Sequence, residues 1–170
     1  VLDKGGIKDL VAEVYEIGGS HLTTSVVDDI KDIGFTYATR SGFSIAISDV
    51  AIPKSKQEII EAALREVEMV QKNFRRGLLT EQERDEQLIN IWQETTTTIA
   101  NEVKVTMDPN GNLATMANSG ATKGGFGPIS QMAGMRGLMA DPSGRIIPWP
   151  IRSNFREGLT ALEYFISTHG

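Results

Sequence analysis

The chain has 170 residues, two histidines, no cysteine and a formal net charge of −5 at pH 7. Cysteine-based zinc sites and three-histidine metal sites are therefore excluded, and the acidic balance disfavours a module that holds nucleic acid by itself. No apolar run approaches the ~20 residues that span a membrane, and the first residues lack a signal-peptide pattern. These features predict a cytoplasmic protein with one domain or two small lobes.

Residues 1–34 are expected to form two helices. Apolar side chains recur at helical spacing over residues 7–17 and again over residues 22–33. The pair Gly18–Gly19 is expected to end the first helix and Gly34 the second, because glycine readily adopts the left-handed conformation found at helix C-termini.

The next stretch, "FSIAISDVAIP" at residues 43–53, alternates apolar and polar side chains. Alternation with a period of two predicts a half-buried strand, with Phe43, Ile45 and Ile47 on the apolar face. Pro53 would end it.

Residues 54–106 contain the clearest pattern in the chain. Ser55-x-x-Glu58 and Thr80-x-x-Glu83 both resemble capping boxes, so each predicts the start of a helix. The two helices, of about 22 residues each, would form an antiparallel hairpin ~33 Å long that projects from the rest of the protein. The expected apolar seams consist of Ile60, Ala63, Val67, Val70 and Phe74 on the first helix and Leu88, Ile91, Thr95, Ile99 and Val103 on the second.

The remaining residues are mixed. A turn, a glycine-rich loop and a short helix or ordered loop precede "RIIPWPI", whose prolines exclude a central strand. Asn154-x-x-Glu157 predicts that the last helix begins at about Asn154. The expected fold is mainly α with a few short strands (α+β), a projecting antiparallel hairpin on a small mixed body, divided into residues 1–52, 53–107 and 108–170.

Two motifs have competing interpretations. The glycine-rich loop at residues 120–127 is either a flexible loop or an anion site, in which backbone N–H groups and Lys123 would hold a phosphate. The cluster Asp28, Asp29 and Asp32 is either a solvated helix face or a metal site, and the solvated face is favoured. No set of side chains completes a catalytic constellation.

Charged side chains gather where the two hairpin helices would meet. They are either an ordinary solvated surface or a docking handle for a partner protein. The set comprises Arg75, Arg76, Glu81, Glu83, Arg84 and Asp85.

Four blocks resemble one family. These are "GFTYATRSGFSIAISDVAIPKSKQEII", "GLLTEQERDEQLINIW", "AGMRGLM" and "NFREGLTALEYFISTHG". They are similar to the largest subunit, β′, of bacterial multisubunit RNA polymerases, and the similarity covers essentially the whole chain.

The resemblance implies a place for each segment. Residues 1–52 would be the end of the pore region, and the hairpin would be the rim helices of the secondary channel, through which nucleotides enter. Residues 135–150 resemble the F-loop. The segment from Asn154 resembles the approach to the bridge helix, which the family continues beyond Gly170.

The resemblance also implies an activity that this chain does not complete. The family's Asp-x-Asp-Gly-Asp pattern, which binds catalytic Mg²⁺, has no counterpart here, so Mg²⁺ would bind outside the chain and the isolated chain would be inactive. The implied partners are the β, α and ω subunits, the rest of β′, incoming nucleotides and Gre-type secondary-channel factors. The implied location is the bacterial cytoplasm, in association with the nucleoid.

Residue roles follow from the same resemblance. The family usually has an arginine near the nucleotide phosphates where this chain has Thr122 and Lys123, so these two are candidates for phosphate contact. Lysine would supply a point charge and not a bidentate fork. The implied active-site scaffold residues are Arg136, Phe165, Thr168 and His169.

Overall fold

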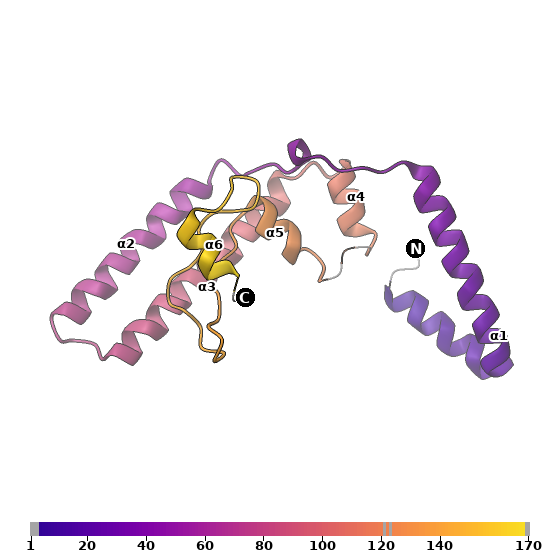
Figure 1. Ribbon diagram of the computed structural model, residues 1–170, viewed down its shortest axis with the longest axis horizontal. Coiled ribbons are helices and arrows are strands. Elements are labelled where there is room, and N and C mark those ends of the chain that lie inside the picture. The colour runs from indigo at the N-terminus through magenta and orange to yellow at the C-terminus, as the bar shows by residue number, and fades with distance from the viewer. Residues whose placement is uncertain (1–3, 121, 123, 169–170) are drawn as a thin grey trace. The chain divides into compact units, whose positions relative to one another are not determined.

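The computed structural model describes residues 4–120, 122 and 124–168, and it is mainly helical, as predicted (Figure 1). In the described residues, strand-like pairing is limited to two isolated antiparallel bridges, Gly137 with Ile151 and Ala140 with Ile146. The helices are α1 (Lys4–Ser41), the short 3₁₀ helix η1 (Ile47–Asp49), α2 (Lys56–Arg75), α3 (Glu81–Thr106), α4 (Asn112–Asn118), α5 (Gly127–Ala133) and α6 (Ala161–Ser167).

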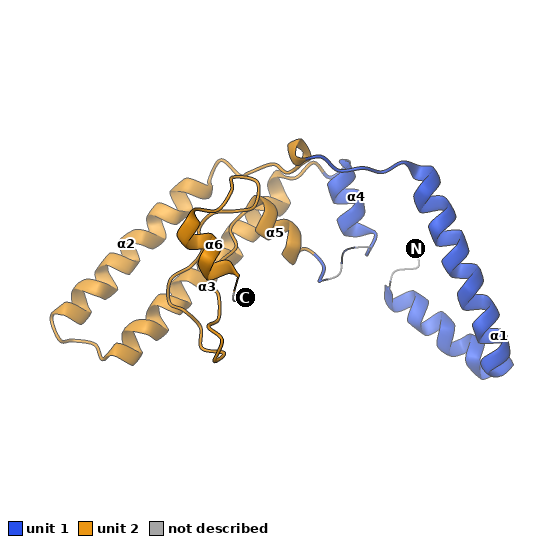
Figure 2. Cartoon of the chain, viewed as in Figure 1, with its two compact units in different colours: residues 1–46, 109–125 blue, residues 47–108, 126–170 orange. Residues whose placement is uncertain are grey.

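The chain divides into two compact units, which Figure 2 colours separately. The first unit comprises residues 1–46 and 109–125 and contains α1 and α4. The second comprises residues 47–108 and 126–170 and contains all the other helices.

Helix α1 is bent at Gly19, where the backbone leaves helical geometry with φ 64° and ψ −165°. The expected break between two helices is therefore present. The expected stop at Gly34 is wrong, because α1 continues to Ser41 and ends only where Gly42 adopts a φ of 65°. A glycine inside a helix weakens it by ~1 kcal/mol without ending it.

No residue of α1 is buried, although its apolar residues recur at helical spacing. Several large apolar side chains of this helix are exposed, including Tyr15, Ile17, Phe35 and Tyr37. Elsewhere in the same unit, Asn112 Nδ2 donates a 2.8 Å hydrogen bond to the carbonyl of Ser44.

The predicted strand at residues 43–53 is wrong. These residues are extended or bent, with η1 in the middle, and Phe43, Ile45 and Ile47 are exposed. A strand needs a partner that accepts and donates ladder hydrogen bonds, and the described residues offer none to this stretch. Val50 and Pro53 are the apolar residues of the stretch that are buried.

Helices α2 and α3 lie side by side and run in opposite directions (Figure 1). The predicted seam of α2 is buried from Ile60 to Val70, and Phe74 is partly buried. On α3 the buried set includes Trp92 in place of Ile91, which is partly exposed. The core between the helices consists of Ile60, Ala63, Val67, Val70, Leu88, Trp92, Thr95, Ile99 and Val103.

The two predicted capping boxes have different outcomes. At Thr80 the box forms, because the hydroxyl accepts from the Glu83 N–H and the Glu83 carboxylate accepts from the Thr80 N–H. At Ser55 it does not form, since this side chain makes no cap bond and donates instead to Glu102 Oε2 of α3 at 2.9 Å. The Ser55 hydroxyl therefore bonds Glu102, which is far away in the sequence, although the local pattern predicts that it caps its own helix.

Helix α5 packs against α3, and the chain then turns sharply at Gly134. A Cβ at this position would lie 2.9 Å from Ile99 Cγ2 and 2.8 Å from the carbonyl oxygen of Ser130. Only glycine permits so close an approach to α3. The following segment folds back on itself through the two antiparallel bridges, and its tip is the turn at Asp141–Gly144.

The last helix begins later than predicted. The reciprocal bonds expected of a capping box do form, as Asn154 Oδ1 accepts from the Glu157 N–H at 2.8 Å and Asn154 N–H donates to the Glu157 carboxylate at 3.4 Å. However, the turn ends at Gly158, whose φ is 88°. Helix α6 starts only after Thr160, which forms a second capping box with Glu163.

Candidate functional site: the start of α6 and its supports

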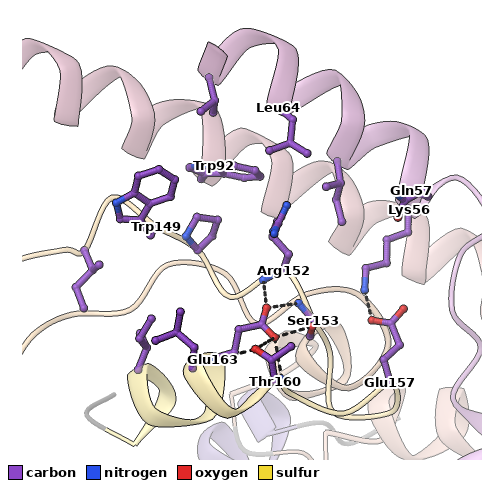
Figure 3. Close-up of a pocket in the computed structure, with 16 residues that line it drawn as sticks. Lys56, Gln57, Leu64, Trp92, Trp149, Arg152, Ser153, Glu157, Thr160 and Glu163 are labelled. Carbon is purple, nitrogen blue, oxygen red and sulfur yellow. Dashed lines mark hydrogen bonds and ion pairs between the residues drawn. The ribbon is translucent and has the colours of Figure 1, made fainter. Parts of the chain in front are cut away.

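The carboxylate of Glu163 joins the first turn of α6 to the extended segment that precedes it (Figure 3). One oxygen, Oε1, accepts the backbone N–H groups of Arg152 at 3.2 Å and Ser153 at 3.3 Å. The other, Oε2, accepts the Ser153 hydroxyl at 2.8 Å together with the N–H and hydroxyl of Thr160, each at 3.0 Å. Five donors therefore converge on one side chain.

Two opposing effects act on the pKa of Glu163. Partial burial raises it, because burial disfavours the charged form. Hydrogen bonds from Thr160 and Ser153 stabilise the carboxylate and outweigh burial, so the pKa lies below its ordinary value of 4.5. The side chain is therefore ionised at neutral pH and keeps its full capacity to accept hydrogen bonds.

Asn154 holds the same segment through a second set of hydrogen bonds. Its side chain is fully buried, and Nδ2 donates to the carbonyls of Ala133 at 3.0 Å and Gly134 at 3.1 Å. These are carbonyls at the C-terminal end of α5, which lack intrahelical partners. Asn154 thus ties the approach to α6 to the end of α5.

A third set of contacts joins this region to the base of the α2/α3 pair. Lys56 Nζ lies 2.5 Å from Glu157 Oε2, and the lysine side chain is only 8% exposed. Arg156 donates from its guanidinium to the carbonyl of Val50. These bonds connect residues that are about a hundred positions apart in the sequence.

A cleft of about 670 Å³ lies between α2, the segment at residues 147–153 and α6 (Figure 3). Trp92 and Trp149 line it, and the indole N–H of Trp92 is buried without an acceptor among the described residues. An unmet buried donor costs about 1–3 kcal/mol. The rest of the lining includes Ile60, Leu64, Arg152, Leu162 and Ile166.

One face of α6 is exposed although it is apolar. Leu162, Tyr164 and Phe165 are 70%, 63% and 65% exposed. Phe165 and Thr168, two of the residues that the sequence assigned to the active-site scaffold, are thus both on this helix or its C-cap, where the Thr168 hydroxyl bonds the Phe165 carbonyl at 2.8 Å. His169 lies outside the described residues.

Arg136, the remaining scaffold candidate, supports the same segment. Its backbone N–H donates to the carbonyl of Ser153 at 3.1 Å. Its guanidinium lies over the ring of Phe155, 5.4 Å from the centroid. Cation–π contacts of this kind contribute about 0.5–1 kcal/mol at exposed sites. Both contacts are made within the protein, and the scaffold role of Arg136 stays a prediction.

The two candidates for phosphate contact cannot be compared in the structure. Thr122 is described, and its hydroxyl is buried without a hydrogen-bond partner among the described residues. Lys123 lies outside the described residues. The phosphate interpretation of this loop therefore stays a prediction from the sequence.

The six charged residues assigned to the hairpin tip have different surroundings. Arg84 bonds Asp85 at 2.6 Å and Glu81 at 3.3 Å, and its guanidinium stacks on Phe74 at 4.5 Å. Glu83 completes the Thr80 capping box, and its pKa is lowered by the Thr80 N–H and hydroxyl. Arg75 and Arg76 are exposed.

These contacts separate the tip residues into two groups. Arg84 and Glu83 stabilise the junction between α2 and α3, so they are poor candidates for partner recognition alone. Arg75 and Arg76 present their charge at the surface.

Two further observations concern the described residues as a whole. The described ranges contain no group of three or more histidine, aspartate or glutamate side chains arranged to hold a metal ion. Among the same residues, no helix combines the length and the apolar character needed to cross a membrane.

Sequence reasoning missed the residue that organises the site. The pattern Thr160-x-x-Glu163 is a capping box as clear as the one at Thr80, and it would have located the start of α6. The extra bonds from Glu163 to Arg152 and Ser153 have no local sequence signal, because they depend on where the earlier segment lies.

The fold and the site define a mainly helical protein that leaves large apolar side chains of α6 exposed. Sequence comparison then identifies its family. Residues 54–157 match the family "RNA polymerase Rpb1, domain 4", and residues 1–50 match "RNA polymerase Rpb1, domain 3". The chain belongs to the family of RNA polymerase largest subunits.

Its relatives include bacterial β′ subunits. The DNA-directed RNA polymerase subunit beta' of Pelotomaculum thermopropionicum is 50% identical over all 170 residues, and that of Desulforamulus reducens is 48% identical over the same length. The subunit of Roseiflexus castenholzii is 53% identical over 152 residues, or 89% of the chain. The chain spans 10% to 14% of the length of these relatives.

Proposed function

We propose that the chain is the part of an RNA polymerase β′ subunit that lines the secondary channel and supports the bridge helix during DNA-templated RNA synthesis. The observation that carries the proposal is the whole-chain similarity to β′, at 50% identity over 170 residues. On this assignment α2 and α3 are the rim helices, residues 135–150 are the F-loop, and α6 is the start of the bridge helix.

The local geometry supports a scaffold role for α6. Its first turn is held by the five bonds to Glu163, while Leu162, Tyr164 and Phe165 expose an apolar face. A helix that is fixed at one end and apolar along one side suits packing against further parts of a large assembly.

The activity belongs to the whole polymerase. Nucleotidyl transfer in this family needs Mg²⁺, which would supply charge stabilisation at the reacting phosphate. The described residues do not fit such an ion, so its ligands would lie elsewhere in the subunit. The partners of this segment would be the rest of β′, the β, α and ω subunits and the incoming nucleotides.

Substitution of Phe165 tests the scaffold role. In a polymerase assembled with full-length β′ carrying Phe165→Ala, we expect an altered elongation rate or altered pausing on a standard template. Val105→Ala, which changes an exposed apolar residue of α3, serves as the matched control. Normal elongation kinetics for the Phe165 variant would count against the proposal.

A second candidate function is docking of Gre-type factors at the tip between α2 and α3. It is favoured by the exposed cations Arg75 and Arg76 beside Leu78, which is 67% exposed. Arg76→Glu should weaken factor binding to the polymerase, and unchanged binding would exclude docking through this charge. Arg84→Glu is the less suitable variant, because it would also break the contacts with Asp85 and Phe74.

The glycine-rich loop offers a further expectation. If Thr122 and Lys123 contact nucleotide phosphates, Lys123→Gln should raise the KM for nucleotides in the polymerase. A KM equal to that of the parent enzyme would favour the alternative, a flexible loop.

A further inference from the structure

We propose that Glu163 is a positioning residue, which fixes the direction of α6 by tying its first turn to the segment at residues 151–153. The proposal rests on the proposed function, in which α6 begins the bridge helix. It assigns to one carboxylate a task beyond capping its own helix.

Glu163 accepts more hydrogen bonds than the capping of α6 requires. A capping box needs only the reciprocal bonds between Thr160 and Glu163, which are present. The carboxylate accepts three further bonds from Arg152 and Ser153, ten or eleven residues earlier in the sequence. Oxygen Oε1 is committed entirely to the two backbone amides of that segment. We call these three bonds the tether.

The other end of the tether is firmly held. Ile151 is fully buried and exchanges two backbone hydrogen bonds with Gly137, at 2.8 Å and 3.0 Å. Ser153 accepts the Arg136 N–H, and the next residue, Asn154, is buried against the end of α5. The tether therefore connects α6 to a rigid support and not to a loose loop.

Helix α6 is mostly exposed to solvent. Among residues 161–167 only Ser167 is buried. Glu163 links this mostly exposed helix to residues 152 and 153 through three hydrogen bonds.

Loss of the tether would affect the residues that follow α6. Because a helix turns as a unit, loss of the tether would let α6 tilt about its first turn, and the residues that follow it in the polymerase would be displaced. In the polymerase such a change should slow the addition step more than it alters the affinity for nucleotides, since no residue of the tether would touch the nucleotide.

The experiment uses polymerases assembled with full-length β′ carrying Glu163→Ala, Glu163→Gln or Thr160→Ala, with Val105→Ala as the activity control. Hydrogen exchange of the Arg152 and Ser153 amides reports the tether, and single-nucleotide addition at several ATP concentrations reports function. For Glu163→Ala we expect about tenfold faster exchange at both amides and a maximal rate lowered about threefold, with KM changed less than twofold.

The other variants distinguish the tether from the cap. Glu163→Gln keeps one acceptor oxygen, so its exchange and rate should fall between those of the parent and the alanine variant. Should Glu163→Ala fail to assemble, this variant decides the question alone. Thr160→Ala removes the capping hydroxyl but leaves the three bonds of the tether, so exchange at Arg152 and Ser153 should equal that of the parent.

Two results would overturn the proposal. Unchanged exchange at Arg152 and Ser153 in both Glu163 variants would show that the tether does not hold the segment. Faster exchange with an unchanged addition rate would show that the tether does not position α6 for the reaction. Either result leaves the proposed function standing if Phe165→Ala still alters elongation.

Discussion

Lys56 and Glu157 form a 2.5 Å ion pair across 101 residues of sequence, and it connects the first turn of α2 with the turn that precedes α6. The two partners differ in exposure, at 8% for the lysine side chain and 39% for the glutamate. Removing one partner is therefore not equivalent to removing the other.

Glu157→Ala should destabilise the chain more than Lys56→Met. The alanine variant leaves a buried ammonium without its partner, at an expected cost of about 2 kcal/mol. The methionine variant leaves a carboxylate that water already reaches, and it keeps the apolar stem in place. Urea unfolding followed by circular dichroism measures both changes in the free energy of unfolding, and equal losses would contradict this account.

The bend of α1 provides a matched pair of glycine substitutions. Gly19 has φ 64° and ψ −165°, a conformation almost restricted to glycine, so Gly19→Ala should cost about 1–3 kcal/mol. Gly34 lies within the helix with open space around its Cα, so Gly34→Ala should stabilise by about 1 kcal/mol. The midpoint of thermal unfolding, monitored at 222 nm, should therefore fall for Gly19→Ala and rise for Gly34→Ala.

A shift of the same sign for both variants would mean that Gly19 is not needed for the bend.

Asn154 is expected to tolerate almost no change. Asn154→Asp keeps the oxygen that accepts the Glu157 N–H but places a buried charge against the carbonyls of Ala133 and Gly134. Asn154→Ala loses the bonds to both carbonyls and also the bond from the Glu157 N–H, but it adds no charge. We expect losses of about 4 kcal/mol or more for the aspartate and about 2–3 kcal/mol for the alanine, measured by urea unfolding.

A loss of unfolding free energy that is smaller for Asn154→Asp than for Asn154→Ala would indicate that water or a proton reaches this site.

The turn at Asp141 allows a test by pH. Hydrogen bonds from the Ser143 hydroxyl and from the backbone of Arg145 and Ser143 hold the pKa of Asp141 below its ordinary value of 3.8. The turn is therefore stabilised fully above the ordinary value, and the contribution is lost as the pH falls through the lowered pKa. Ser143→Ala should raise this pKa toward 3.8, as measured by NMR titration of the carboxyl carbon.

An unchanged pKa in the Ser143→Ala variant would assign the shift to the backbone N–H groups and the charge of Arg145.

Local patterns in the sequence predicted most of the buried positions of α2 and α3. The seams of α2 and α3 follow the helical period, and each buried position depends on neighbours three or four residues away. The Thr80 box and the turn at residues 141–144 are likewise local, because all their partners lie within four residues. Such features can be read from the sequence without knowledge of the fold.

The failures arise where a distant partner decides the outcome. Ser55 bonds Glu102 and not its own helix, and the alternating stretch at residues 43–53 lacks a second strand. At Asn154 the predicted box forms, but Gly158 turns the chain before a helix can grow. The supports of α6 were missed for the same reason, since Glu163 and Lys56 bond residues that sequence spacing does not bring together.

The bond from Arg156 to the carbonyl of Val50 spans 106 residues, and this distance constrains the order of folding. During synthesis α2 and α3 can pair as soon as both have left the ribosome, because their contacts are comparatively local. Val50 and Lys56 can form their bonds with Arg156 and Glu157 only after residues 154–157 have been synthesised. We therefore expect the residues around Val50 and Lys56, at the start of α2, to be the last part of this unit to become protected from proteolysis on the nascent chain.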